Sequence, residues 1–362
     1  MNHITIIAGA RPNFMKVAPI IHEIIKSKAK GIDIDYSLVH TGQHYDKKMS
    51  GDFFEQLNIP KPDVNLSAGG GTQAEQTGAI MICLEEYLMK NSTDLVLVVG
   101  DVTSTMACAI TAQKLQIKVA HVEAGIRSND WSMPEEINRL VTDAITNYFF
   151  TTSEVANANL KASGYSDDQI FFVGNCMIDT LLANRPRFIQ PPIWEELGLS
   201  EKGYFMMTLH RPANVDEGAK LKELMDEIIN NSQEMPLVFP VHPRTKMTLN
   251  EIGIEHERLH MVDPMSYLEF NYLIERSFAV VTDSGGITEE TTVMGVPCLT
   301  LRDNTERPET ITVGTNELIG TDSKNIAPAM KTLFAGEWKK GGIPELWDGK
   351  TASRIINHLI NL

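Results

Sequence analysis

The sequence predicts an α/β protein with two Rossmann-like parallel-sheet domains and a cleft between them. Short apolar runs rich in β-branched residues alternate with amphipathic helical segments, which is the pattern of repeated βαβ units. The chain has 362 residues, too many for a typical single core. A proline-rich stretch, residues 185–192, is typical of a linker. We therefore place the first domain at residues 1–184, the second at 185–350 and a final helix at 351–362.

The composition of the chain limits which partners, cofactors and cellular locations we expect. The net charge of −15 disfavours nucleic acid as a partner, because binding a phosphate backbone needs a basic face. No apolar run approaches the ~20 residues of a membrane span and no signal peptide is visible, so we expect a cytoplasmic protein. No G-x-G-x-x-G follows the first strand of either domain, and no metal-ligand cluster is visible, so we expect no NAD and no metal. The cysteines are scattered through apolar segments, which favours buried thiols over disulfides or zinc ligands: Cys83, Cys108, Cys176 and Cys298.

The most informative stretch is residues 279–310. A buried strand at 279–282 leads through Ser284, Gly285 and Gly286 into a helix, so free backbone N–H groups and the positive end of a helix meet at one point. Such a turn suits a phosphate or diphosphate. It also suits tight packing in an ordinary βαβ unit, which is the competing interpretation.

Two side chains favour the nucleotide interpretation of this stretch. Glu290 lies in the second turn of the predicted helix, where a carboxylate can accept hydrogen bonds from ribose hydroxyls. Arg307 can return from the next loop as a cationic clamp. Tyr267 and Phe270, in a helical segment at residues 264–273, are candidate walls for a base.

Acidic residues follow neighbouring strands of the first domain. Asp101 comes after the strand at residues 95–99, and Glu123 comes after the strand at 118–122. Glu135 lies in the first turn of the next helix, where a carboxylate is also ordinary helix electrostatics. We expect all three at the carboxyl edge of the sheet, where repulsion would raise at least one pKa and equip the site for acid–base chemistry.

Cations and a histidine complete the candidate set. Arg11 and Lys16 lie near the start of a helix that follows the first strand. Cations there oppose the helix dipole, so they suggest an anionic ligand, although a solvated helix start is the plainer explanation. His210 follows the strand at residues 203–209 and lies beside Arg211. A lone histidine is more often structural than catalytic, but a strand end beside an arginine raises the expectation of function above that base rate.

Ten segments resemble, in this order, the motifs of the non-hydrolysing UDP-N-acetylglucosamine 2-epimerases. They are GARPNFMK, TGQHYD, VVGDVTSTMA, HVEAGIRS, MPEEINRLVTD, VGNCMIDTL, TLHRPANVD, PVHPRT, VTDSGGITEET and RDNTERPET. The resemblance covers nearly the whole chain. It implies the two-domain fold of glycogen phosphorylase and related glycosyltransferases (glycosyltransferase-B-like), with the last helix packed back on the first domain.

The resemblance also implies an activity without a cofactor. UDP-N-acetylglucosamine and UDP-N-acetylmannosamine would interconvert through elimination of UDP, a 2-acetamidoglucal intermediate and re-addition of UDP. It further implies a homodimer. The residues implied as catalytic are Asp101, Glu123, Glu135 and His210, and those implied to contact UDP are Arg11, Lys16, Phe270, Ser284, Gly285, Gly286, Glu290 and Arg307.

This chain departs from the family pattern at two places. Asn13 stands where many members carry Glu. Bacterial members can bind a second substrate molecule as activator, and Gln43, His44 and His242 are candidate regulatory residues here. The following loop, SAGGGTQAEQTG, has no Arg to hold a second diphosphate, so we expect no strong activation by substrate.

Four alternative functions stay open. TGQHYD and IPKPDVNL also resemble epimerases of a UDP-2,3-diacetamido uronic acid sugar, and hydrolysing relatives release free N-acetylmannosamine. A glycosyltransferase of the same fold would need fewer clustered carboxylates. A non-catalytic nucleotide-sugar sensor would not need the acidic residues or His210.

Overall fold

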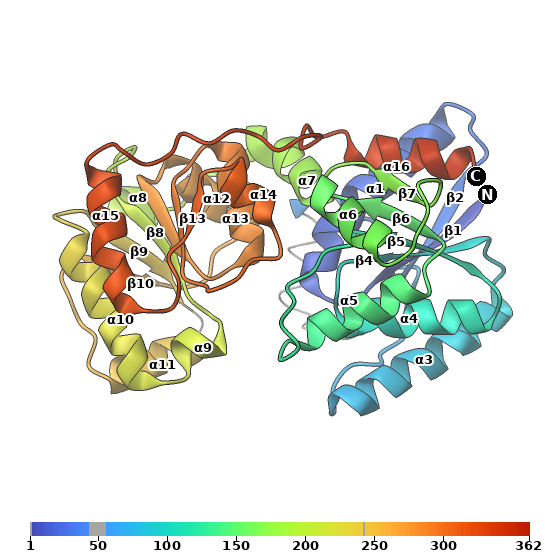
Figure 1. Cartoon of the computed structure of the whole chain (residues 1–362), viewed down its shortest axis with the longest axis horizontal. Coiled ribbons are helices and arrows are strands. Elements are labelled where there is room, and N and C mark those ends of the chain that lie inside the picture. Colours follow the sequence, from blue (N-terminus) through green and yellow to red (C-terminus); the bar gives the residue numbers. More distant parts are fainter. Residues whose placement is uncertain (1, 43–55, 242) are drawn as a thin grey trace. The chain divides into compact units, whose positions relative to one another are not determined.

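A computed structural model describes residues 2–42, 56–241 and 243–362, and it divides the chain into two compact units. Unit 1 comprises Met1–Ala183 and Glu345–Leu362, and unit 2 comprises Asn184–Pro344. The chain thus leaves unit 1 at Ala183 and returns at Glu345, so residues 345–350, which we assigned to the second domain, lie with unit 1. Each unit is a parallel sheet covered by helices (Figure 1), which confirms the predicted class of two parallel-sheet α/β domains.

Unit 1 has a seven-stranded sheet in the order β3-β2-β1-β4-β5-β6-β7, in which all neighbouring strands are parallel. The strands are β1 (His3–Ala8), β2 (Asp35–His40), β3 (Val64–Asn65), β4 (Leu95–Val99), β5 (Lys118–Val122), β6 (Tyr148–Thr151) and β7 (Ile170–Phe172). The helices are α1 (Arg11–Ala29), α3 (Gln73–Lys90), α4 (Thr103–Lys114), α5 (Pro134–Ala144), α6 (Glu154–Ala162), α7 (Cys176–Asn184) and α16 (Thr351–Ile360).

The core of unit 1 explains why its central strands are apolar throughout. β4, with the sequence LVLVV, is buried at every position, because helices cover both faces of the sheet. Side chains of α3 and α4 pack on one face, against Ile7, Val39, Val96, Val98 and Val119.

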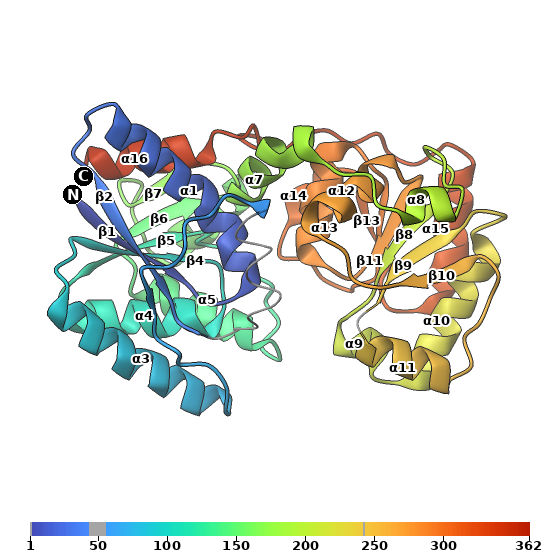
Figure 2. The same cartoon turned by 180° about the vertical axis from the view of Figure 1, so that it is seen from behind.

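The C-terminal helix α16 belongs to unit 1 and packs against α1, as the two views show (Figures 1 and 2). The carboxylate of Asp179, on α7, accepts the backbone N–H groups of Thr351 at 3.1 Å and Ala352 at 2.8 Å. This buried carboxylate caps the first turn of α16. The indole N–H of Trp347 donates to the Thr152 carbonyl at 3.2 Å. This hydrogen bond holds the segment that precedes α16 against unit 1.

Unit 2 has a six-stranded parallel sheet in the order β10-β9-β8-β11-β12-β13. The strands are β8 (Phe205–Thr208), β9 (Leu237–Pro240), β10 (Leu259–Val262), β11 (Ala279–Thr282), β12 (Cys298–Thr300) and β13 (Asn316–Leu318). The helices are η1 (Arg185–Arg187), α8 (Ile193–Glu196), α9 (Pro212–Val215), α10 (Gly218–Asn231), α11 (Pro243–Glu251), α12 (Tyr267–Arg276), α13 (Gly285–Met294), α14 (Pro308–Thr312), η2 (Ser323–Asn325) and α15 (Ile326–Phe334).

Two apolar clusters fill the space above and below this second sheet. One joins α10 and α15 to one face through residues such as Phe205, Leu224 and Met330. The other joins α8 and α12 to the opposite face through residues such as Tyr204 and Leu273. Alternate residues of β8 therefore face different helix layers, as a two-faced sheet requires.

Two predicted segments differ in detail. The helix expected at residues 264–273 begins at Tyr267, because Ser266 and Glu269 form a reciprocal capping box, and it continues to Arg276. Part of the stretch expected as linker, Arg185–Arg187, forms a short 3-10 helix. Across residues 2–42, 56–241 and 243–362, no helix is long and apolar enough to cross a membrane.

Candidate active site

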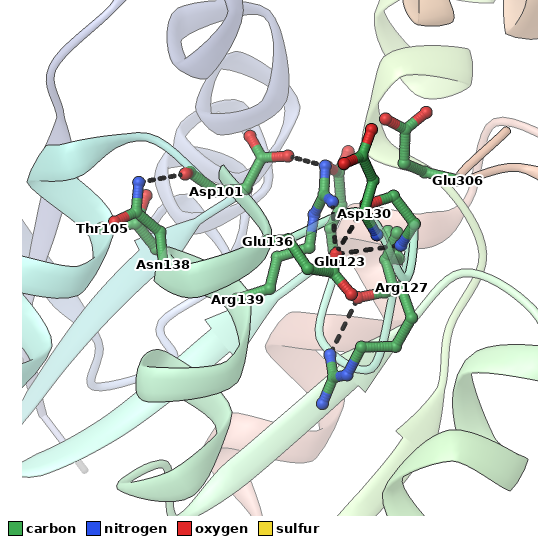
Figure 3. Close-up of polar contacts among 12 residues, drawn as sticks. Asp101, Thr105, Glu123, Arg127, Asp130, Glu136, Asn138, Arg139 and Glu306 are labelled. Carbon is green, nitrogen blue, oxygen red and sulfur yellow. Dashed lines mark hydrogen bonds and ion pairs between the residues drawn. The ribbon is translucent and has the colours of Figure 1, made fainter. Parts of the chain in front are cut away.

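The turn after β4 carries Asp101 and is held from two directions. Its first residue, Gly100, donates its N–H to the Val122 carbonyl at 3.0 Å, so the turns after β4 and β5 are joined at the sheet edge. On α5, Asn138 donates its side-chain amide to the Asp101 carbonyl at 2.8 Å, and Arg139 forms an ion pair with the Asp101 carboxylate (Figure 3). Helix α5 thus fixes both the backbone and the side chain of Asp101.

Glu123 follows β5 in a conformation that is unusual for a residue with a side chain. Its φ is 70°, in the left-handed region, and its side chain is buried. Its Oε2 lies 2.5 Å from Nζ of Lys16 on α1. A Cβ on Gly100, which has φ 68°, would lie 3.0 Å from this Nζ, so glycine leaves room for the pair. Strained backbone beside a buried ion pair is typical of functional sites.

Lys16 already has an anionic partner in Glu123, so its position near the start of α1 does not by itself require an anionic ligand. Asn13 has a structural task at the same helix end. Its Oδ1 accepts the backbone N–H groups of Gly9 and Ala10, and its Nδ2 donates to the Val99 carbonyl at 3.1 Å. The amide of Asn13 therefore caps α1 and connects it to β4.

The side chain of Arg11, which begins α1, lies outside the described positions.

Glu135 and Glu136, adjacent on α5, differ in their surroundings. Glu136 is buried and accepts four hydrogen bonds, from the Ser128 N–H and hydroxyl, the Asn129 N–H and Arg139. Burial raises the pKa of Glu136, but these hydrogen bonds outweigh it and hold the pKa below its ordinary value. Glu135 is partly buried and has no hydrogen-bond or ion-pair partner among the described residues. Glu136 therefore anchors the preceding loop, and Glu135 is left available for a ligand.

In unit 2, His210 follows β8 and pairs with Asp283, which follows β11. His210 Nδ1 lies 2.8 Å from Asp283 Oδ1, and the histidine side chain is 61% exposed while the aspartate is 0% exposed. Asp283 also accepts the backbone N–H groups of His210 and Arg211 and the side-chain amide of Asn214. Burial raises the pKa of Asp283, but these hydrogen bonds and the His210 charge lower it overall. An ionised Asp283 holds Nδ1 and leaves Nε2 for other partners.

The first turn of α13 has the features of an anion site. Ser284 is the N-cap residue, but its side chain makes no capping hydrogen bond. Among the described residues, nothing requires glycine at position 285, because a Cβ there would meet no described atom nearer than Arg302 Nη1 at 3.8 Å and its φ is not positive. Packing within the chain therefore does not explain Gly285, whereas close approach of a ligand to the helix N-terminus does.

Arginines gather beside this turn, and both are paired with carboxylates. Arg302 forms a bidentate pair with Glu306, with 2.8 Å between Nη1 and Oε2 and 2.8 Å between Nη2 and Oε1. Its buried Nε has no hydrogen-bond partner within the described parts of the chain. Arg307 forms a buried ion pair with Glu289 of α13. Arg307 thus lies against the helix that begins with the glycine turn, and Arg302 joins it as a cation that the sequence did not single out.

Glu290 is buried on α13, and the hydroxyl of Tyr267 donates to its Oε1 at 2.8 Å. Burial raises the pKa of Glu290 to about 7, and the hydrogen bond from Tyr267 only partly offsets it. Tyr267 is buried and is a hydrogen-bond partner of Glu290, and its role as a wall for a base stays a prediction. Phe270, one turn further along α12, is partly buried against the cluster that includes Tyr204 and Leu273. The candidate regulatory residues Gln43, His44 and His242 lie outside the described residues.

The candidate residues are divided between the two units. Unit 1 holds Asp101, Glu123, Glu135 and Lys16, and unit 2 holds His210, Ser284, Glu290 and Arg307. Sequence reasoning missed Arg139 and Asp283. Asp283 could have been found by the rule that selected Asp101, because it directly follows a buried strand. Arg139 had a weaker signal, since it lies one helical turn after Glu135.

Comparison with known proteins shows which family this chain belongs to. The profile of the family described as UDP-N-acetylglucosamine 2-epimerase matches residues 26–360. The chain belongs to this epimerase family. The UDP-N-acetylglucosamine 2-epimerase of Methanocaldococcus jannaschii is 39% identical over 368 residues, which cover 98% of each chain. Its crystal structure in complex with UDP-GlcNAc and UDP matches with a TM-score of 0.88 over 99% of this chain and 100% of that one.

Another epimerase is equally similar in sequence. The UDP-2,3-diacetamido-2,3-dideoxy-D-glucuronate 2-epimerase of Pseudomonas aeruginosa is 39% identical over 368 residues and 100% of both chains. A lipopolysaccharide outer core galactosyltransferase, 14% identical with a TM-score of 0.59, shares the fold alone. This likeness agrees with the glycosyltransferase-B-like class expected from the sequence.

Proposed function

We propose that this epimerase interconverts UDP-N-acetylglucosamine and UDP-N-acetylmannosamine without hydrolysing them. The observation that carries the proposal is the acid–base edge of unit 1, where Glu123 is buried in a left-handed conformation beside the turn that holds Asp101. Its support is the full-length similarity to the Methanocaldococcus jannaschii enzyme of that name.

The proposed reaction has two half-reactions. A base removes the proton from carbon 2, and the electron pair of that C–H bond forms the double bond between carbons 1 and 2. The bond between carbon 1 and oxygen breaks, and UDP leaves with its electron pair. UDP then adds back to carbon 1 as carbon 2 receives a proton on the opposite face. Atoms and electrons balance without an oxidant, a metal or water.

We divide the work between the two units. Asp101, Glu123 and Glu135 are the proposed proton-transfer groups, because carboxylates in different surroundings can hold and release protons near neutral pH. The first turn of α13, with Arg302 and Arg307, is proposed to stabilise the charge on the departing diphosphate. His210, oriented by Asp283, is a further proton-transfer or leaving-group residue. The homodimer implied by the resemblance stays a prediction.

The alternative with a specific observation in its favour is 2-epimerisation of a UDP-2,3-diacetamido uronic acid. The Pseudomonas aeruginosa relative with that name matches the chain end to end at the same 39% identity. The two substrates differ at carbons 3 and 6 of the sugar. The reacting carbons are the same, so the proposed roles of the residues are unchanged.

The test is proton NMR of each UDP-sugar incubated with the protein in heavy water. We expect the 2-epimer to appear with deuterium at carbon 2, because the returning proton comes from groups that exchange with solvent. Oxygen-18 in the bridge between carbon 1 and the diphosphate should scramble as UDP leaves and returns. Retention of the original hydrogen after complete conversion would contradict elimination. Release of free N-acetylmannosamine carrying solvent oxygen would show a hydrolysing enzyme instead.

A further inference from the structure

A buried network lies behind the turns that carry Asp101 and Glu123. His121, on β5, places Nδ1 2.8 Å from Asp143 Oδ1 and Nε2 2.8 Å from the Gly100 carbonyl oxygen. Asp143, near the end of α5, uses Oδ2 to accept the backbone N–H of Gly125 at 3.1 Å and Nη1 of Arg127 at 2.6 Å. The exposed fractions of His121 and Asp143 are 0% and 1%, so solvent does not compete for these hydrogen bonds.

The imidazole of His121 lies between a carbonyl oxygen and a carboxylate. A carbonyl oxygen can only accept, so Nε2 donates to Gly100. Burial raises the pKa of Asp143, but His121 and Arg127 outweigh it and lower the pKa overall, so the carboxylate is ionised. The same carboxylate lies 2.8 Å from Nδ1 of His121 and 2.6 Å from Nη1 of Arg127. His121 therefore links the Gly100 carbonyl to Asp143, and it shares this carboxylate with Arg127.

One carboxylate thus fixes two turns of the candidate site. Through His121, Asp143 holds the carbonyl of Gly100, the residue before Asp101. Through Gly125 and Arg127, it holds the segment that follows Glu123. Non-glycine residues persist in left-handed backbone only where their surroundings over-determine it, and the two anchors after Glu123 supply that constraint.

We infer that His121 and Asp143 are positioning residues, which hold Asp101 and Glu123 in register for proton transfer without contacting the substrate. This inference rests on the proposed function only in the role of Asp101 and Glu123. The network itself uses none of the residues proposed to bind UDP. An error of about 1 Å in the position of a catalytic group can lower a rate about 100-fold, so the network should affect kcat more than substrate binding.

The experiment compares His121→Gln and Asp143→Asn with wild type. We expect kcat to fall about 100-fold in each variant, with KM changed by less than about threefold. The matched control is Asp179→Asn, which also removes a buried carboxylate charge from unit 1 but acts on the first turn of α16. The control should keep kcat within about threefold of wild type. Circular dichroism and thermal melting establish that each variant is folded.

Two further measurements are independent of turnover. Nitrogen-15 NMR of the wild-type protein should show Nε2 of His121 protonated, because its partner is a carbonyl oxygen. Amide hydrogen exchange should accelerate at residues 100–101 and 123–127 in Asp143→Asn, and not in Asp179→Asn. An unprotonated Nε2, or a folded His121→Gln variant with wild-type kcat, overturns the inference. If the wild-type protein turns over neither UDP-sugar, the proposed function fails, and the NMR and exchange measurements still decide the inference.

Discussion

At the scale of single residues, Glu123 and Glu290 show two ways of burying a carboxylate. Glu123 has a cationic partner in Lys16 at 2.5 Å, so its charge is balanced inside the protein. Glu290 is also buried, but its pKa is raised to about 7 by that burial, and its hydrogen-bond partners, the Tyr267 hydroxyl and the Asn271 side chain, are neutral. A ligand with hydroxyl donors would supply what Glu290 lacks, in keeping with the expected ribose contact.

Glu290→Gln should therefore stabilise the ligand-free protein above neutral pH. The pKa in the folded state is raised from 4.5 to about 7, so the folded wild type holds this proton more tightly than the unfolded chain. Its stability falls as pH rises from the unfolded pKa through the folded one. The variant should gain up to about 3 kcal/mol in free energy of unfolding above the folded pKa, and nothing well below the unfolded pKa.

Urea unfolding over this pH range measures the effect. Glu337→Gln, at an exposed position of unit 2, removes the same charge and should change little at any pH. The Glu290→Gln variant should also bind UDP more weakly, since an amide accepts hydrogen bonds less strongly than a carboxylate. A gain in stability that is equal at all pH values would contradict the raised pKa.

At the scale of elements, α5 inverts the usual pattern of a surface helix. It buries Glu136, Asn138, Arg139, Thr142 and Asp143, while Ile137 is 44% exposed. Burying a polar group costs free energy unless it is hydrogen-bonded. Asn138 and Arg139 contact Asp101, and Asp143 holds the segment after Glu123. The buried hydroxyl of Thr142 is an exception, with no hydrogen-bond partner among the described residues. The buried face of α5 is polar, so this helix mainly positions the candidate site residues and contributes little to the apolar core.

Helix α13 offers a test of the two explanations for its glycines. Gly285→Ala should be tolerated or stabilise the fold by up to about 1 kcal/mol, because alanine is the better helix former and its Cβ meets nothing nearer than 3.8 Å. The same change should weaken UDP binding by placing a methyl group where the diphosphate approaches. Thermal melting and calorimetric titration with UDP measure both effects.

The matched control lies at the other end of the same helix. Gly295 has φ 71°, and a Cβ there would meet nothing within 4 Å, so Gly295→Ala introduces backbone strain alone. This variant should melt lower and bind UDP as wild type does. If Gly285→Ala also lost stability and kept its UDP affinity, that glycine would serve the fold and not a ligand.

At the scale of the whole molecule, the proposed division of labour predicts different defects in the two units. Asp101→Asn and Glu135→Gln should abolish turnover and leave UDP affinity nearly intact. Arg307→Ala should weaken UDP binding by about 1.5–3 kcal/mol, because it removes a charge-assisted hydrogen bond. Calorimetric titration with UDP separates the groups, and equal losses of affinity in both would refute the division.

Turnover should also be unaffected by removing metals. Dialysis of the protein against EDTA is expected to leave activity unchanged, since the proposed chemistry needs only charge stabilisation and proton transfer. Among the described residues, no group of three or more His, Cys, Asp or Glu side chains is arranged to hold a metal ion. Loss of activity that a divalent cation restores would contradict this expectation.

The local order of the sequence determined the fold class and much of the site. Apolar runs such as 95–99 and 279–282 mark buried parallel strands, and residues directly after them must lie at the carboxyl edge of a sheet. This rule placed Asp101, Glu123, His210 and Ser284 without knowledge of any contact. Glu135 and Glu136 both lie in the first turn of α5, and the structure shows that their surroundings differ.

Only the tertiary structure decided which partners these residues have. His210 meets Asp283 across 73 positions of the chain, and Asp101 meets Arg139 across 38. Such pairs depend on strand order and helix rotation, which no pattern within one segment specifies. Burial also depends on the whole fold, because the raised pKa of Glu290 and the hydrogen-bond partners of His121 follow from what surrounds these side chains. The sequence by itself determined where the functional groups stand, and desolvation and long-range pairing in the folded protein decided their charge and orientation.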